Sequence, residues 1–173
     1  LTPESLIKLA ISFGDIDPGH PVYPNVEGFP SIVLLKNNEN NKPDTNDWHK
    51  DLTFKSNPPF ASILHGINVP KIGGDTIWAS MSAAYESLPN GWKKDLEALD
   101  AIHDMGAFRN DFYRDGGIDN VNMSLKNIGS AVHKVVGIHP ISELKYLNVN
   151  QSFTRNIVNV SQGDSDHILQ FLF

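Results

Sequence analysis

The 173-residue sequence contains no cysteine and no long run of apolar residues. Without cysteine there is no disulfide bond, no thiolate metal ligand and no cysteine nucleophile, so histidine and carboxylate groups are the expected metal ligands. The longest, nearly uninterrupted apolar stretches, such as 32–35 and 132–138, are far shorter than the roughly 18–20 residues of a membrane helix. We therefore expect no membrane span, and we take the cytoplasm as the default location.

Basic residues are scarce relative to acidic ones. The sequence has 14 Lys and Arg against 20 Asp and Glu, which gives a formal net charge of −6. Such a chain lacks the positive charge that drives binding to nucleic acid, so the expected partner is a small molecule; assembly into a homo-oligomer is left open. The hydrophobic fraction of 40% is enough for a packed core, and the length fits a single domain over residues 1–173.

The two ends of the sequence both predict helices. Thr2-Pro3-Glu4 is typical of a helix start, with proline in the first turn. Ser161, followed three residues later by Asp164, predicts the N-cap of a second helix, and no Gly, Asn or Pro stops this helix before Phe173. Because the last helix lacks a stop signal, we expect the 173 residues to be part of a longer domain, truncated at both ends.

Between the ends, the sequence favours short strands with helices at the edges. Apolar spacing predicts that Leu6, Leu9, Ala10 and Phe13 form the buried face of the first helix, and Trp92, Leu96 and Leu99 that of a later one. Trp48 and Trp78 are expected in the core or in a pocket wall. The polar segment 109–129 is expected to be a surface loop, either a lid or disordered. The predicted fold class is mainly β with added helices, a sandwich or jelly roll. Helices are predicted at 3–13, 81–88 and 91–101, strands at 31–35, 60–69, 75–79, 131–139 and 145–150, and a turn at 140–143.

His49 and Asp51 are the first candidates for metal chemistry. In an extended segment, side chains at positions i and i+2 point to the same side, so an imidazole nitrogen and a carboxylate oxygen can converge on one cation. Two histidines and one carboxylate on one side of an iron ion leave the opposite positions open for substrate and oxygen. Taken alone, however, the pair is more simply interpreted as an exposed edge of a loop.

The pair belongs to the motif Trp48-His49-Lys50-Asp51, and other motifs lie on both sides of it along the chain. They are His20-Pro21-Val22-Tyr23-Pro24 before it, and Gly73-Gly74-Asp75-Thr76 with Trp78, then His139-Pro140, and finally Asn148-Val149-Asn150 with Phe153-Thr154 after it. Their order resembles that of the Fe(II)- and 2-oxoglutarate-dependent taurine dioxygenase family, over nearly the whole chain. The resemblance implies a double-stranded β-helix, or jelly roll, of which this sequence is an incomplete central portion of the catalytic domain.

The resemblance also implies an activity and its cofactors. Such an oxidoreductase couples the oxidative decarboxylation of 2-oxoglutarate by O₂ to hydroxylation of a small sulfonate such as taurine, with release of sulfite and aminoacetaldehyde. By resemblance, His49 and Asp51 are catalytic and supply two of three Fe(II) ligands. The third ligand, a histidine, and the arginine that pairs with 2-oxoglutarate are expected beyond Phe173. Thr76 matches a residue that binds the 2-oxoglutarate carboxylate, although a threonine that simply favours a strand is the alternative.

Five residues are implied in substrate binding. His20 and Tyr23 resemble the residues that hold the sulfonate and form an aromatic wall, because an imidazole can donate to an anionic oxygen. Phe153 and Leu52 are further candidates for the pocket. Thr45 stands where members acting on taurine usually carry asparagine, so a polar contact to the substrate is altered. A surface histidine at position 20 and a core phenylalanine at position 153 are the alternatives.

Two other functions compete with sulfonate hydroxylation. One is the same chemistry on an alkyl sulfate, an aryloxyacetate or another small acid, which the pocket residues rather than the metal pair would decide. The other is a metal-binding jelly roll without turnover. A zinc hydrolase is a more distant alternative, because it needs no site for a keto acid.

Overall fold

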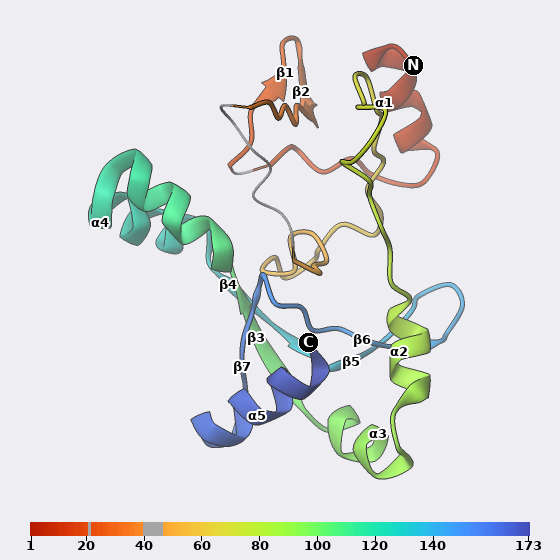
Figure 1. Cartoon of the computed structure of the whole chain (residues 1–173), viewed down its shortest axis with the longest axis vertical. Helices are drawn as coiled ribbons and strands as arrows, with labels where there is room; N and C mark the ends of the chain where they lie inside the picture. Colours follow the sequence, from red (N-terminus) through yellow and green to blue (C-terminus); the bar gives the residue numbers. More distant parts are fainter. Residues whose placement is uncertain (21, 40–46) are drawn as a thin grey trace. The chain divides into compact units, whose positions relative to one another are not determined.

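The computed structural model describes residues 1–20, 22–39 and 47–173. The chain divides into two compact units, one formed by residues 1–46 with 59–75 and the other by residues 47–58 with 76–173. Figure 1 shows the elements of both units. The candidate residue Thr45 lies outside the described residues.

The first unit contains one helix and a small hairpin. Helix α1 (Pro3–Ile11) begins where predicted, and the Thr2 hydroxyl accepts a hydrogen bond from the Ser5 backbone N–H. Strands β1 (Asn25–Val26) and β2 (Phe29–Val33) pair antiparallel. The predicted strand at 31–35 is therefore present, but it begins and ends two residues earlier.

Two predictions for the chain before residue 80 are wrong. Helix α1 has no buried residue, and the predicted core residues Leu9 and Phe13 are 40% and 65% exposed. Residues 60–69 and 75–79 are irregular rather than strands. The physical reason is that a strand requires a neighbour for its backbone N–H and C=O groups, and in the described part of the chain no strand pairs with either segment. Strand-favouring composition alone does not supply that neighbour.

The second unit is built on a three-stranded antiparallel sheet. Strand β3 (Asp100–Asp104) lies between β4 (Ser130–Lys134) and β7 (Thr154–Ile157). The register places His103 opposite Ala131 and Thr154. A separate hairpin joins β5 (Val136–Ile138) to β6 (Lys145–Leu147), which confirms the predicted pairing and the turn at 140–143 over these shorter spans.

Helices α2 (Met81–Ser87), α3 (Asn90–Glu97) and α5 (Gln162–Leu172) contribute to the core of this unit. Leu96 is buried, and Trp92 and Leu99 pack against the core, which confirms the predicted burial of these residues; the predicted end of the helix at residue 101 is wrong, because α3 ends at Glu97 and Leu99 follows it. The predicted cap of α5 is confirmed as well, because the Ser161 hydroxyl accepts from the Asp164 backbone N–H. The expected burial of Trp48 and Trp78 is wrong: they are 50% and 82% exposed, since neither segment is covered by other described parts of the chain.

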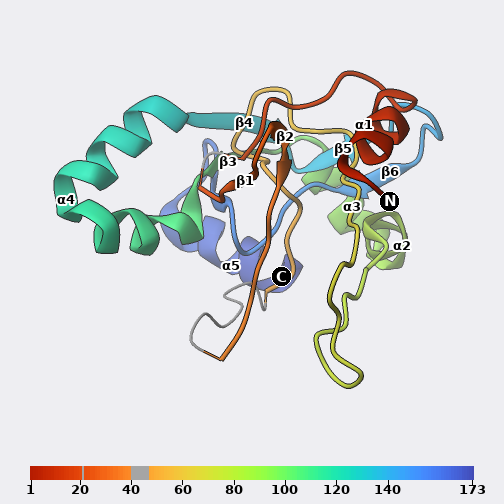
Figure 2. The same ribbon diagram turned by 90° about the horizontal axis from the view of Figure 1, so that it is seen from above.

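The predicted surface loop at 109–129 is a helix instead. After a short 3-10 turn, η1 (Gly106–Phe108), helix α4 (Arg109–Ile128) runs to the start of β4, with a break at Gly116 and Gly117, whose backbone angles are not helical. Figures 1 and 2 show two helical arms meeting at a bend. The glycines and asparagines of this segment lower helix propensity and disguise the helix in the sequence. They also account for the break.

The observed fold is a mixture of helices and antiparallel sheets. Within the described residues the sheets have two or three strands each, so they do not form a complete jelly roll. Among these residues, no helix has both the length and the apolar character needed to cross a membrane.

Candidate functional site

His49 and Asp51 lie side by side at the start of the second unit. The distance between His49 Nε2 and Asp51 Oδ1 is 3.4 Å. Two atoms this far apart can both contact one divalent cation at about 2.0–2.2 Å, the usual distance for imidazole and carboxylate ligands. The predicted same-side arrangement is therefore observed, and the donor set fits part of a site for a first-row metal ion. Within the described residues, no group of three His, Cys, Asp or Glu side chains is close enough to hold a metal.

The His49 ring is oriented by a second contact. His49 Nδ1 lies 2.9 Å from the Asp47 carbonyl oxygen, which only accepts hydrogen bonds, so Nδ1 carries a proton. Nε2 is thereby directed at Asp51, as in metal sites where a carbonyl orients a histidine ligand. The hydrogen bond to the Asp51 carboxylate, aided by the Asp47 carbonyl, raises the pKa of His49 to about 9. In the absence of a cation, a proton therefore occupies the space between the two side chains.

The residues that follow Asp51 are fixed in the core. Leu52, Thr53 and Phe54 are all buried. Leu52 has a φ of 53°, in the left-handed region that a leucine rarely adopts. Such a conformation costs about 1–2 kcal/mol and persists only when neighbouring contacts enforce it. The turn next to the candidate ligands is thus held in place by its surroundings.

Those surroundings are one face of the β3–β4–β7 sheet. The hydroxyl Oγ1 of Thr53 lies 2.9 Å from His103 Nδ1 and accepts from Asn150 Nδ2 at 3.3 Å. His133 Nε2 lies 2.8 Å from the Thr53 carbonyl oxygen and 3.0 Å from that of Lys55. The side chains of His103, His133 and Asn150 thereby bind both the Thr53 side chain and the backbone carbonyls of Thr53 and Lys55.

His103 is the most buried member of this layer. It is completely buried, and its Nε2 has no hydrogen-bond partner in the described part of the chain. Burial, followed by the positive charges of His133 and Lys50, lowers the pKa of His103 to about 4. The ring is therefore neutral near pH 7.

Aromatic rings pack beside the same segment. The Phe153 ring is 5.2 Å from that of Phe54, edge to face, and 5.8 Å from that of Phe108. Phe153 is only 4% exposed. The candidate pocket residue Phe153 therefore lies within a cluster that also buries Phe54, one position after Thr53.

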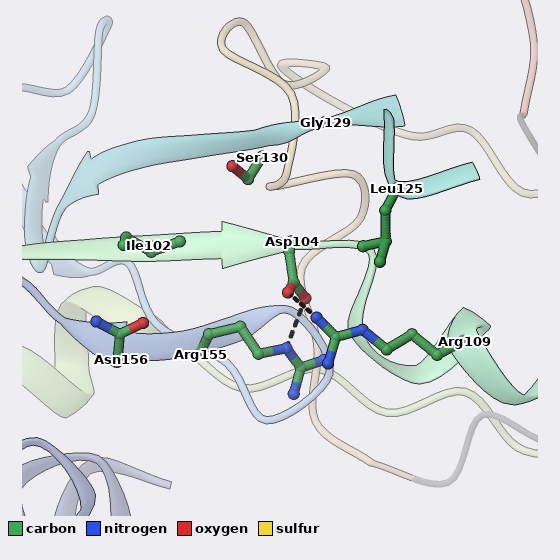
Figure 3. Close-up of a pocket in the computed structure, with 8 residues that line it drawn as sticks. All are labelled: Ile102, Asp104, Arg109, Leu125, Gly129, Ser130, Arg155 and Asn156. Carbon is green, nitrogen blue, oxygen red and sulfur yellow. Dashed lines mark hydrogen bonds and ion pairs between the residues drawn. The ribbon is translucent and has the colours of Figure 1, made fainter. Parts of the chain in front are cut away.

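The opposite face of the sheet has a different chemistry. An open pocket of about 390 Å³ includes Asp104, Arg109 and Arg155 in its lining. Figure 3 shows both guanidinium groups turned toward the Asp104 carboxylate, which Arg155 Nε reaches at 2.5 Å and which also accepts from the Gly106 backbone N–H at 2.8 Å. Since one carboxylate engages both arginines, we interpret this cluster as a structural link that fixes the turn after β3.

Gly106 has a strict steric role in this turn. Its φ is +42°, and a Cβ atom at this position would be 1.8 Å from the Ser152 carbonyl oxygen. Any larger residue would displace the turn that places Phe108 against Phe153.

His20 and Tyr23 form a pair within the first unit. Their ring centroids are 4.6 Å apart, and His20 Nδ1 accepts backbone N–H groups from Val22 and Tyr23 at 3.1 and 3.2 Å. Because Nδ1 accepts, the proton of the neutral ring is on Nε2. The ring N–H of neutral His20 is of the kind that can donate to an anionic group.

The remaining candidates are less constrained. Thr76 is exposed in the irregular segment before α2. Two further histidines make contacts with the backbone: His133 Nε2 lies beside two carbonyl oxygens, and His139 Nδ1 accepts from the Ile141 and Ser142 backbones in the predicted turn. The ion-pair cluster at Asp104 was not predicted, because Arg155 lies 51 positions away from Asp104 and no local pattern connects the two.

A protein family and a solved structure both match this chain over nearly all of its length. The family described as "Taurine catabolism dioxygenase TauD, TfdA family" matches residues 1–173. The crystal structure of a taurine dioxygenase from Burkholderia xenovorans superposes with a TM-score of 0.76 at 30% identity, covering 99% of this chain and 54% of that chain.

Two curated relatives are also named as alpha-ketoglutarate-dependent dioxygenases. An alpha-ketoglutarate-dependent sulfate ester dioxygenase from Pseudomonas putida is 31% identical over 157 residues, which are 88% of this chain and 51% of the relative. An alpha-ketoglutarate-dependent sulfonate dioxygenase from Saccharomyces cerevisiae is 29% identical over 126 residues, 73% of this chain and 29% of the relative. The chain thus spans about half or less of the length of these relatives. Since the match extends over all 173 residues, the chain belongs to the taurine catabolism dioxygenase TauD, TfdA family.

Proposed function

We propose that this chain is part of the jelly-roll catalytic domain of an Fe(II)- and 2-oxoglutarate-dependent dioxygenase that hydroxylates a small sulfonate, with taurine as the first candidate. The products are then succinate and CO₂ from 2-oxoglutarate, and sulfite and aminoacetaldehyde from taurine. The observation that carries the proposal is the 3.4 Å approach of His49 Nε2 to Asp51 Oδ1 on an anchored turn, in a chain of this family.

His49 and Asp51 would hold the Fe(II) ion, together with a third ligand expected beyond Phe173. The bound ion would supply the activation of O₂ that drives both decarboxylation and hydroxylation. The chain's own contribution is to hold the two ligands in register: the Asp47 carbonyl keeps Nδ1 of His49 protonated, so Nε2 can bind the metal. The Thr76 hydroxyl is proposed to donate to a carboxylate of 2-oxoglutarate.

The substrate is proposed to bind through its anionic head. The His20 Nε2–H donates to a sulfonate oxygen, and Tyr23, whose ring packs on His20, forms an adjacent wall. Phe153 and Leu52 border the space for the short carbon body, and Thr45 offers a hydroxyl where asparagine is usual.

The test uses the full-length protein with taurine, 2-oxoglutarate and Fe(II). We expect His49→Ala and Asp51→Ala to abolish succinate and sulfite formation and to weaken Fe(II) binding in calorimetry, without a change in far-UV circular dichroism. His139→Ala is the matched control, because the ring of this histidine accepts from the Ile141 and Ser142 backbones in the 140–143 turn. Normal turnover by His49→Ala would refute the ligand assignment, and Fe(II) binding without any turnover by the wild type would favour a binding protein.

A sulfate ester is the second candidate substrate, because the relative from Pseudomonas putida is named for one. Hydroxylation of the carbon next to sulfur in a sulfonate releases an aldehyde and sulfite, whereas hydroxylation of the carbon next to oxygen in an ester releases an aldehyde and sulfate. Hexanesulfonate and hexyl sulfate have the same alkyl chain, so the ratio of sulfite to sulfate measures head-group preference directly. Sulfate release far above sulfite release from every sulfonate would replace the first candidate with the second.

A further inference from the structure

We propose that His133 is a positioning residue, whose ring N–H clamps the backbone that follows the two candidate ligands and so keeps His49 and Asp51 in register for metal binding. This inference rests on the proposed function for its consequence, but the clamp itself can be tested without metal. His133 is 84 positions away from His49 in the sequence and comes from β4.

The geometry of the clamp determines which atom donates. His133 Nε2 is 2.8 Å from the Thr53 carbonyl oxygen and 3.0 Å from the Lys55 carbonyl oxygen. A carbonyl oxygen can only accept, so Nε2 carries the proton and donates to both. One N–H shared between two carbonyls fixes the direction of two peptide groups at once.

The clamped segment is a turn under strain. The Lys55 backbone N–H donates to the Leu52 carbonyl at 3.0 Å, and Leu52 has the left-handed φ of 53°. A leucine released from its neighbours would return to negative φ, because its side chain disfavours the left-handed region. That change would rotate the peptide between Asp51 and Leu52 and move the Asp51 carboxylate away from His49.

Other contacts reach the turn through a side chain rather than through its backbone. His103 and Asn150 both contact the Thr53 hydroxyl. This hydroxyl can move by rotation about the Cα–Cβ bond of Thr53 without any movement of the backbone. His133 instead holds the main chain on both sides of Phe54. For this reason we assign the positioning of the backbone to His133.

Three variants separate the clamp from simple loss of stability. His133→Phe keeps a flat ring and removes the N–H, whereas His133→Gln keeps an N–H near the position of Nε2. Ser165→Ala is the control: it removes a buried hydrogen bond from the Ile157 N–H at 2.8 Å, in the same unit but outside the turn. Should His133→Phe fail to fold, His133→Asn, whose amide is too short to reach both carbonyls, takes its place.

The measurements are hydrogen–deuterium exchange on the metal-free full-length protein and Fe(II) affinity by competition with a chelator. In His133→Phe we expect exchange of the amides at 52–55 to be roughly 10-fold faster, with β3 exchanging as in Ser165→Ala. Fe(II) affinity should fall by about 10- to 100-fold, the usual effect of losing a residue that supports metal ligands. His133→Gln should restore both values to near those of the wild type.

Each outcome decides a separate point. Unchanged exchange at 52–55 in His133→Phe would overturn the clamp. Faster exchange with unchanged Fe(II) affinity would confirm the clamp but overturn its role in positioning the ligands. If the wild type binds no Fe(II), the proposed function fails, while the exchange data still decide whether His133 holds the turn.

Discussion

The two units of this chain differ in how they bury their side chains. Every buried side chain among the described residues belongs to the second unit, formed by residues 47–58 and 76–173. In the first unit many large apolar side chains are exposed, including Leu64 at 67% and Ile72 at 93%, and the others are only partly buried. Apolar burial is the main source of folding free energy, so the second unit carries the stability of the structure described here.

The candidate site residues are divided between the same two units. His49 and Asp51 precede a buried turn of the second unit, whose backbone is fixed by the sheet. His20 and Tyr23 belong to the first unit and hold one another through a ring contact and local backbone bonds. The candidate metal ligands therefore adjoin a packed core, whereas the proposed anion donor His20 contacts Tyr23 and the backbone within its own local segment.

The largest expected difference comes from truncating one leucine in each unit. Leu96 is 1% exposed in the core, so Leu96→Ala should lower the free energy of unfolding by about 2–5 kcal/mol, the cost of a buried cavity. Leu64→Ala makes the same chemical change at a 67% exposed site and should alter it by less than about 0.5 kcal/mol. Urea unfolding measures both. Equal effects would show that the first unit is as well packed as the second.

A smaller change in the free energy of unfolding is expected from the titration of His103, which belongs to the second unit. The pKa of His103 is about 4 in the folded protein and about 6.5 in the unfolded chain, so between these values the unfolded state binds more protons. The contribution of His103 to the free energy of unfolding should therefore be fully present above pH 6.5 and be lost as the pH drops toward 4. Through this group alone, the loss from pH 7 to pH 5 is about 2 kcal/mol.

A variant isolates this contribution from other titrating groups. His103→Asn keeps a polar atom near the position of Nδ1, beside Thr53, and removes the titration. Urea unfolding at pH 7 and pH 5 should show a smaller loss in the variant than in the wild type. An identical loss in both proteins would mean that His103 is not the group responsible.

Local signals in the sequence were sufficient for several elements. The starts of α1 and α5 follow from Thr2 and Ser161, whose side chains make the expected caps. The i, i+2 spacing of His49 and Asp51 predicted that their side chains approach each other, as observed. Their role as iron ligands remains a prediction.

Tertiary pairing explains what could not be predicted. Residues 100 and 101 were expected to end a helix, but residues 100–104 form the central strand because 130–134 and 154–157 pair with them. Residues 60–69 have strand composition and remain irregular where no described strand pairs with them. The hydrogen bond from His133 to the Thr53 carbonyl joins positions 80 residues apart. No local sequence pattern predicts a contact over that separation.

The smallest expected effect compares two equivalent helix caps. Thr2 Oγ1 accepts from the Ser5 N–H at 3.3 Å in the first unit, and Ser161 Oγ accepts from the Asp164 N–H at 3.2 Å in the second. Removing such a cap costs about 1 kcal/mol of helix stability. Helix α5 is tied to the core through buried Leu169 and Ser165, so Ser161→Ala should lower the global free energy of unfolding by about that amount.

Helix α1 has no buried residue, so Thr2→Ala should fray its first turn without a measurable change in global unfolding. Hydrogen exchange at residues 3–6 should increase in Thr2→Ala, whereas urea unfolding should respond only to Ser161→Ala. Because the two caps have nearly the same local geometry, any difference between the variants measures how strongly each helix is coupled to the core. Equal losses of about 1 kcal/mol in urea would show that α1 unfolds together with the second unit, and the contrast between the two units would then be one of burial alone.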